Sequence, residues 1–238
     1  KPPFLTVHGA PSVKEATLVD WLHVKGVSLS TLSGEERHGI VHRIDKETSG
    51  ALVIAKTNEA HVELSKQLED KSMGRYYVAI IDQALKEHTV VDLPIGRSTR
   101  NRLKMDVTKE GRAAKSAFCK LSLAKDGKKE LIAIKLFTGR THQIRVHMSS
   151  IGHPILGDEI YGPAKCPYKL QGQTLHAKIL GITHPSTGEY IEFDAPLPDY
   201  FKDLLNKLLN QIIPNRPIDD FFNTLKEVSN LLNNRSSY

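Results

Sequence analysis

The chain has 238 residues, of which 39% are hydrophobic and 25% are charged, and its formal net charge is +6. Such a composition is typical of a globular protein with a substantial core, and no apolar stretch approaches the ~20 residues that cross a bilayer. The two cysteines, Cys119 and Cys166, have no metal-ligand spacing, so we expect a reducing, cytoplasmic environment. The first residue is Lys1 rather than Met, which suggests that upstream residues are missing.

Five short segments rich in β-branched and aromatic residues predict strands. They cover residues 51–55, 76–81, 114–123, 131–137 and 189–193. Between the third and the fourth, "AKDGKK" contains an Asp-Gly pair, which favours a hairpin turn.

Two helices are predicted between these strands. Asn58 is a candidate N-cap for a helix through Asp70, and a second helix starts near Thr141 and ends before Gly152. Their buried faces follow the helical period and consist of Ala60, Leu64 and Leu68 in the first and Ile144, Met148 and Ile151 in the second. Because helices and strands alternate without a βαβ rhythm, we expect an α+β fold with a mixed, mainly antiparallel sheet and flanking helices.

The last part of the chain, residues 202–238, differs from the rest. "FKDLLNKLLNQII" predicts an amphipathic helix that stops at Pro214, and "DDFFNTLKEVSNLL" predicts a second one. We expect a C-terminal helical extension packed on the main domain, with a docking surface for a partner as the alternative.

The positive charge is concentrated in one segment, residues 97–120. This segment holds eight Lys or Arg residues against two acidic ones, so it alone carries +6 and the rest of the chain is balanced. A polyanionic partner such as a nucleic acid fits this distribution. A hairpin with solvated charged edges fits it equally well.

A carboxylate stands in a small basic loop in "RHGIVHRIDKETSGALVIAKT", residues 37–57. Asp45 lies between Arg43 and Lys46, with His42 just before them. Nearby cations keep an aspartate ionised, as a carboxylate nucleophile requires. A structural ion pair in a turn is the alternative interpretation.

Two other segments contain groups suited to binding. In "GRYYVAI", residues 74–80, Tyr76 and Tyr77 point to opposite faces of a strand, so one ring can line a pocket for a base. Residues 137–162 are dense in side chains that bind anions, and they open on a predicted helix N-terminus. These side chains are Arg140, His142, Gln143, Arg145, His147 and His153.

Taken in order, these segments resemble the RluA-type RNA pseudouridine synthases, of the ribosomal large subunit type. The resemblance rests on "KPPFLTVH", "HRIDKETSGALVIAK", "RYYVAI", "TGRTHQIRVHMSSIGHPILGDEIYG" and "LHAKILGITHPSTGEYIEFDAPLPDYF". It covers residues 1–201, which we therefore expect to form the catalytic domain, with a central cleft. Many relatives carry an N-terminal S4-type RNA-binding domain, and we expect none in this chain.

The resemblance implies a role for each matching residue. Asp45 corresponds to the catalytic aspartate, and Arg145 to the arginine that pairs with it. Arg43 corresponds to the arginine that displaces the target base, Tyr77 to the tyrosine that packs on the flipped uracil, and Ile144 to an apolar pocket position. Further substrate-binding candidates are His42, Arg140 and Gln143. Arg75 stands where the family has lysine, and we assign it no role.

The implied reaction converts a uridine in RNA to pseudouridine by base flipping, without a metal or another cofactor. We expect ribosomal RNA as the partner, with transfer RNA as an alternative, no membrane association, and a monomer. A non-catalytic RNA-binding module is one rival interpretation. The other is a metal-dependent phosphodiesterase that would use the histidines and Asp158.

Overall fold

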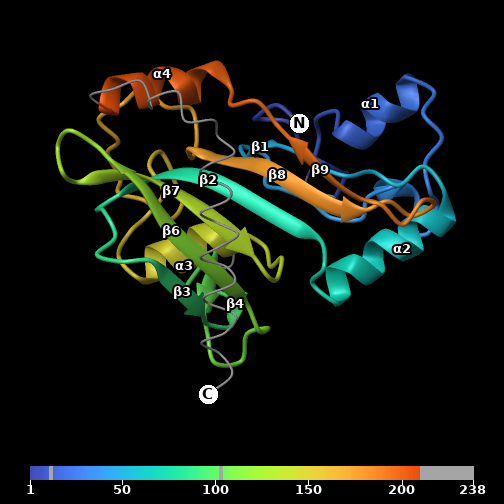
Figure 1. The fold of residues 1–238 in the computed structure, drawn as a ribbon, viewed down its shortest axis with the longest axis horizontal. Coiled ribbons are helices and arrows are strands. Elements are labelled where there is room, and N and C mark those ends of the chain that lie inside the picture. The colour runs from blue at the N-terminus through green and yellow to red at the C-terminus, as the bar shows by residue number, and fades with distance from the viewer. Residues whose placement is uncertain (11–12, 102–103, 210–238) are drawn as a thin grey trace. The chain divides into compact units, whose positions relative to one another are not determined.

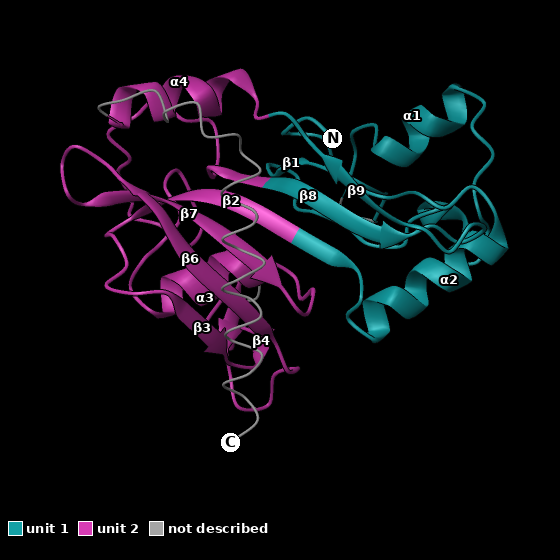
Figure 2. Cartoon of the chain, in the orientation of Figure 1, with its two compact units in different colours: residues 1–75, 177–196 teal, residues 76–176, 197–238 magenta. Residues whose placement is uncertain are grey.

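The computed structural model describes residues 1–10, 13–101 and 104–209, which fall into two compact units (Figures 1 and 2). Unit 1 combines residues 1–75 with residues 177–196, and unit 2 combines residues 76–176 with the chain from residue 197 onward. The boundaries fall inside strands β2 (Gly74–Asp82) and β8 (Leu175–Thr183), so the chain passes between the units within these two strands. None of the helices in the described ranges has the length and hydrophobicity of a membrane-spanning segment.

Unit 1 contains helices α1 (Leu18–Val24) and α2 (Asn58–Glu69), the short helix η1 (Glu35–Arg37), and strands β1 (Ser49–Gly50) and β9 (Tyr190–Asp194). The predicted helix in residues 58–70 is confirmed, although Thr57 rather than Asn58 is its N-cap, because the Thr57 side chain accepts the Ala60 N–H. The face of α2 that carries Leu64 packs into a core with β8, which buries Ala55, Met73, Leu180 and Ile182.

The predicted strand in residues 51–55 is wrong, since the chain forms β1 just before this segment and then only an isolated bridge between Ile54 and Ile40. Its backbone groups find other partners: the Val53 N–H donates to His42, and the Ala55 N–H donates to the Gly39 carbonyl. An apolar run with such local partners does not need a sheet neighbour along its whole length.

Unit 2 is built on an antiparallel sheet. Its order is β2, β7 (Lys129–Leu136), β6 (Lys115–Leu123) and β3 (Thr89–Asp92). The β6–β7 hairpin turns at the predicted Asp-Gly pair, where Gly127 has φ +66° and Asp126 accepts the backbone N–H groups of Lys128 and Lys129. Four of the five predicted strands are therefore confirmed, and so is the α+β class.

Both helices of unit 2 are amphipathic. Helix α3 (Gln143–Ser150) buries Ile144 and Met148 as predicted, while Ile151 is half-buried at its C-cap. Helix α4 (Asp199–Leu208) buries Phe201, Leu204, Leu205 and Leu208. The first helix predicted in the C-terminal part is confirmed up to Leu208, where α4 ends with an extended Leu209 instead of continuing to Pro214. The second predicted helix lies outside the described residues.

A second, smaller hairpin carries part of the basic segment. Strands β4 (Ile95–Arg97) and β5 (Met105–Val107) pair antiparallel. Beneath them lies a small apolar cluster in which Ile95, Ala114 and Val146 of α3 are buried against Met105, Val107 and Tyr161. The basic hairpin is therefore seated on α3.

Candidate active site

Two backbone features of unit 1 fix the loop that carries Asp45. The Thr48 N–H donates to the backbone carbonyl of Asp45 at 3.1 Å, which closes a turn that begins at Asp45. At the end of the loop, Gly50 has φ +117°, and a Cβ there would lie 2.1 Å from the carbonyl oxygen of Ala177 in β8. Only glycine fits that position, which explains the Ser-Gly step after the loop.

Lys1 also fixes the loop. Its Nζ donates to the carbonyls of Pro2, Leu5 and Lys46 at 3.0, 2.8 and 2.8 Å. Burial lowers the pKa of Lys1 to about 8, while the Asp45 carboxylate opposes this shift. Lys1 was not predicted as a site residue, although it begins the Lys-Pro motif, and it places a cation near the half-buried Asp45.

His42 acts on the backbone of the loop. Its Nε2 accepts the Val53 N–H at 3.1 Å, which requires a ring without a proton on Nε2. Burial, together with the charge of Arg75, lowers the pKa of His42 to about 3. The ring is therefore neutral at physiological pH and gives no positive charge to an anion. Arg43, by contrast, is exposed to solvent.

Tyr76 and Tyr77 lie side by side in β2 and are both buried in unit 2. Tyr76 pairs in register with Lys135, whose Nζ lies 5.8 Å from the Tyr76 ring centroid. Tyr77 pairs with Ile134 and belongs to the opposite face of the strand. The structure thus gives the two rings different surroundings, as their alternation predicts.

Arg145 is held in a buried ion pair near the start of α3. Its Nε and Nη2 donate to the two carboxylate oxygens of Asp158 at 2.7 and 2.9 Å. Burial alone would raise the pKa of Asp158, but hydrogen bonds from Arg145, Tyr161 and Ile160 outweigh it and hold this pKa below its usual value. A two-point pair of this kind fixes the plane of the guanidinium group.

Gln143 and Arg140 shape the turn that precedes α3. The Gln143 side chain is buried and accepts from Thr138 and from the Arg140 N–H, while its amide donates to Lys115 and Ser116. Arg140 is half-buried, and its Nε donates to the Ala113 carbonyl. Burial and the neighbouring Arg112 lower the pKa of Arg140. Arg140 is therefore bonded to the residue that follows Arg112 in the chain.

The histidines of residues 137–162 have different contact partners. His147 is buried between Ser116 and the Leu93 carbonyl, and His142 contacts Tyr161. In the described part of the chain, no three His, Cys, Asp or Glu side chains converge as metal ligands. The arrangement of these histidines and Asp158 therefore does not provide the ligand cluster that the phosphodiesterase interpretation requires.

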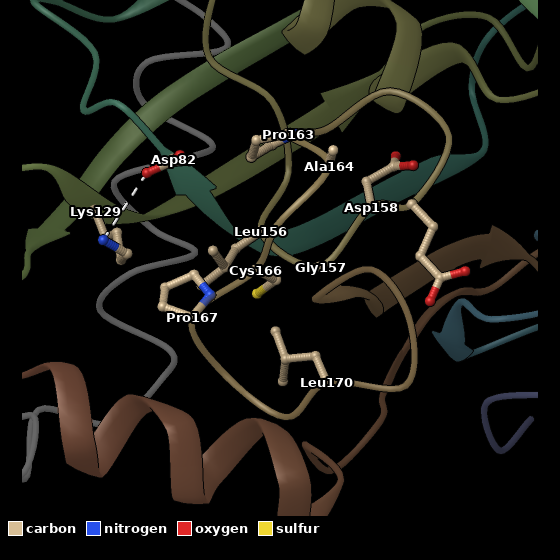
Figure 3. A pocket seen from close by; sticks show the side chains of 11 residues that line it. Asp82, Lys129, Leu156, Gly157, Asp158, Pro163, Ala164, Cys166, Pro167 and Leu170 are labelled. Carbon is tan, nitrogen blue, oxygen red and sulfur yellow. Dashed lines mark ion pairs between the residues drawn. The ribbon is translucent and has the colours of Figure 1, made fainter.

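A cavity of about 300 Å³ opens beside Asp158 in unit 2 (Figure 3). One wall carries Asp82 and Lys129, whose charged atoms lie 3.9 Å apart. Residues between 156 and 170 supply the rest of the lining, and Cys166, Pro167 and Leu170 make it partly apolar. Apart from Asp158, which only the phosphodiesterase interpretation would use, the residues that line this cavity include none of the predicted site residues.

The structure thus places the predicted residues in two groups. His42, Arg43 and Asp45 share one loop of unit 1, while Tyr77, Arg140, Gln143, Ile144 and Arg145 belong to unit 2. Sequence reasoning missed Asp158 as the partner of Arg145, and it missed Tyr161, although both lie in the quoted segment 137–162. Their spacing from Arg145 carries no helical or strand period, so only the folded loop reveals the contact.

Comparisons with known proteins agree with the sequence resemblance. A family model described as RNA pseudouridylate synthase matches residues 1–150. An uncharacterized RNA pseudouridine synthase of Helicobacter pylori (strain J99) is 46% identical over 215 residues, which cover 87% of this chain and 64% of that protein. The ribosomal large subunit pseudouridine synthase D of Zymomonas mobilis is 44% identical over 220 residues, which cover 88% and 68%. The chain spans about two thirds of the length of these relatives.

Solved structures give the same result. Human RNA pseudouridylate synthase domain containing 4 superposes with a TM-score of 0.66 at 25% identity, covering 87% of each chain. Human RNA pseudouridylate synthase domain containing 1 gives a TM-score of 0.66 at 26% identity, covering 88% of this chain and 85% of the other. Because the family model covers more than half of the chain and the relatives share over 40% identity, the chain belongs to the RNA pseudouridylate synthase family.

Proposed function

We propose that this chain is an RNA pseudouridine synthase that isomerises specific uridines to pseudouridine in large-subunit ribosomal RNA. The family membership supports the reaction type. Relatives named ribosomal large subunit pseudouridine synthase D, from Zymomonas mobilis and Nitrosomonas europaea, support this choice of RNA. The observation that carries the proposal is Asp45, a half-buried carboxylate on a loop fixed by Lys1 and Gly50.

The reaction leaves the atoms of the nucleotide unchanged in number. The C1′–N1 glycosidic bond breaks, the uracil rotates, a C1′–C5 bond forms, and the proton on C5 moves to solvent or to N1. Asp45 starts this sequence as a nucleophile, by adding to C6 of the base or to C1′ of the ribose, or as a base at the ribose. A carboxylate serves each route only when it is ionised, since protonation removes its lone-pair charge.

The other residues prepare the nucleotide for this attack. Arg43, exposed on the same loop, displaces the target uridine from its stack and offsets part of the few kcal/mol that flipping costs. Tyr77 packs against the flipped ring and assists removal of the C5 proton, and Ile144 supplies an apolar wall. The resemblance assigns Arg145, whose guanidinium group is held by Asp158, to keep the catalytic carboxylate ionised.

The remaining predicted residues act on binding in different ways. Arg140, next to Arg112, contributes positive charge for RNA phosphates. Gln143 acts through the turn that it holds together, because its side chain is buried and bonded within the protein. His42 likewise acts through the loop backbone.

Asp45→Asn is the direct test, because it keeps the shape of the side chain and removes its negative charge. RNA from cells with and without the gene is mapped for pseudouridine by carbodiimide modification and primer extension. We expect one or a few stops in large-subunit ribosomal RNA to disappear without the gene and to return with wild type but not with Asp45→Asn. The matched control is Asp203→Asn on the exposed face of α4, which should restore the stops fully.

The purified protein gives an independent reading. Transcripts labelled with tritium at C5 of uridine release the label when pseudouridine forms, so Asp45→Asn should lower this release by about four orders of magnitude or more if the nucleophile is lost. Stops that disappear only from transfer RNA would contradict the ribosomal substrate. Unchanged maps in every RNA, with no tritium release, would contradict the enzyme and favour an RNA-binding module.

A further inference from the structure

Tyr161 contacts three separate parts of unit 2 from the loop that follows α3. Its hydroxyl oxygen lies 2.9 Å from the Met105 amide nitrogen of β5 and 2.8 Å from Nδ1 of His142, the N-cap of α3. Its ring centroid lies 5.1 Å from Cζ of Arg145. One side chain therefore joins the basic hairpin, the start of α3 and the buried arginine.

The direction of the hydroxyl bonds follows from the donors available. The Met105 N–H can only donate, so the Tyr161 oxygen accepts from it. The same oxygen also bonds His142, donating its hydrogen when Nδ1 carries no proton and accepting when it does. His142 has φ 55° and ψ 21°, a left-handed conformation that is uncommon for residues other than glycine, although histidine adopts it more often than most. The Tyr161 hydroxyl is thus one of the contacts that hold this turn in place.

The backbone around Tyr161 is fixed by the same carboxylate that orients Arg145. Asp158 accepts the N–H groups of Ile160 and Tyr161 at 3.0 Å each, in addition to the guanidinium group. On the other side, the Lys104 Nζ donates to the Ile160 carbonyl at 2.5 Å and lies 5.9 Å from the Tyr161 ring centroid. The loop is therefore bonded to the hairpin through a lysine and to α3 through an ion pair.

We propose that Tyr161 is a positioning residue that couples the basic hairpin β4–β5 to Arg145. The hydroxyl carries the link to the hairpin, because it bonds β5 to the N-cap of α3. The ring carries the link to the arginine, because it covers one face of the guanidinium group. RNA held by the hairpin thereby favours the orientation of Arg145 that the reaction needs. This inference rests on the proposed function.

Two substitutions separate the links. Tyr161→Phe removes the hydroxyl and keeps the ring, so the Met105 N–H loses its acceptor while Arg145 keeps its contact. We expect KM for RNA to rise about three- to tenfold, the effect of a lost hydrogen bond, and kcat to fall less than in the variant that also loses the ring, because the ring still contacts Arg145. Tyr161→Leu removes the ring as well, and kcat should fall about tenfold or more in addition.

Tyr168→Phe is the matched control in the same loop. The ring centroid of Tyr168 lies 5.8 Å from the Nζ of Lys129 in β7, whereas that of Tyr161 lies near Lys104 and Arg145. Both KM and kcat should stay at their wild-type values. Thermal unfolding of all three variants shows whether a change in kinetics merely follows a loss of stability.

A second measurement does not depend on turnover. The Nε–H of Arg145 is hydrogen-bonded and buried, so it is observable by NMR in protein with 15N-labelled arginine and is assigned with Arg145→Lys. RNA should shift this resonance in wild type, and Tyr161→Phe should reduce the shift at saturating RNA by half or more if the hydroxyl transmits it.

The outcomes distinguish the coupling from the proposed function. Wild-type KM and an unchanged Arg145 shift in Tyr161→Phe would overturn the coupling even if the enzyme is active. If the changes in kcat and KM are explained by a loss of thermal stability, Tyr161 has only a structural role. The wild type could be inactive and still show an RNA-dependent shift of the Arg145 resonance that needs Tyr161. That result would contradict the proposed function but support the coupling.

Discussion

His42 accepts the Val53 N–H in the loop that carries Asp45, and its pKa is lowered to about 3 by burial and by Arg75. A histidine in the unfolded chain has a pKa of ~6.5. Below that pH, His42 is protonated in the unfolded state but stays neutral in the native state. The stability that His42 contributes is therefore complete above pH ~6.5 and is lost as the pH falls toward 3. His61 and His147, whose pKa values are also lowered by burial, change stability in the same direction.

His42→Gln tests this at the scale of one residue. Glutamine offers an oxygen to the Val53 N–H but does not titrate. We expect the unfolding free energy of wild type to fall between pH 6 and 4 more steeply than that of the variant, by up to about 1.4 kcal/mol per pH unit. Urea unfolding at several pH values measures both slopes. Equal slopes for His42→Gln and wild type would contradict a neutral His42, and His23→Gln on the exposed side of α1 is the control.

At the scale of elements, the short strand β1 places the end of the Asp45 loop against β8. The Gly50 N–H donates to the Lys1 carbonyl, and the Ala51 N–H donates to the Ala177 carbonyl at 2.9 Å. This approach needs the absence of a side chain at Gly50, because the atoms that a methyl group there would meet first belong to the Ala177 backbone and cannot swing aside. The close contact between the Asp45 loop and β8 therefore depends on the glycine at position 50.

Gly50→Ala should destabilise unit 1 strongly, by about 3 kcal/mol or more, since strain at positive φ adds to a clash with backbone. Gly188→Ala is the matched comparison, because Gly188 has φ +72° but nothing within 4 Å of its Cβ position. That change should cost only about 1 kcal/mol, the strain alone. Urea unfolding of both variants measures the difference, and equal losses would show that close packing at Gly50 is unimportant.

At the scale of the whole molecule, the net charge of +6 is that of residues 97–120 alone. Arg100 and Lys109 are exposed near the turn and the end of the β4–β5 hairpin, and Arg112 is exposed beyond it. A concentrated charge of this kind binds phosphates by releasing counterions, which makes affinity fall as salt rises. The hairpin is thus the part of the molecule that we expect to set the salt dependence of RNA binding.

The double variant Arg100→Gln, Lys109→Gln should weaken RNA binding and lower the slope of log Kd against log salt by about 1.4 to 1.8, for two lost phosphate contacts. Filter binding at four or more salt concentrations measures this slope. Lys71→Gln with Lys169→Gln removes the same charge from exposed sites outside the basic segment and should leave the slope unchanged. Equal slopes for both double variants would mean that total charge, rather than the hairpin, determines binding.

Local patterns were enough for most elements. The Asp-Gly turn of the β6–β7 hairpin, the apolar period of α2 and the burial of Ile144 and Met148 are each set by neighbours within a few residues, so a sequence contains them. The segment 51–55 failed for the complementary reason. Its composition is that of a strand, but its backbone partners are His42 and Gly39, which its own residues do not specify.

Short motifs and their order were sufficient to predict the family, the α+β class, the basic segment and candidate roles for Asp45, Tyr77 and Arg145. What each of these side chains touches could be read only from the folded chain. Arg145 meets Asp158 and Tyr161 through a loop without periodicity, and the charge of His42 depends on how deeply it is enclosed beside Arg75. Contacts, desolvation and orientation arise between residues distant in the chain, so they exist only once the chain has folded.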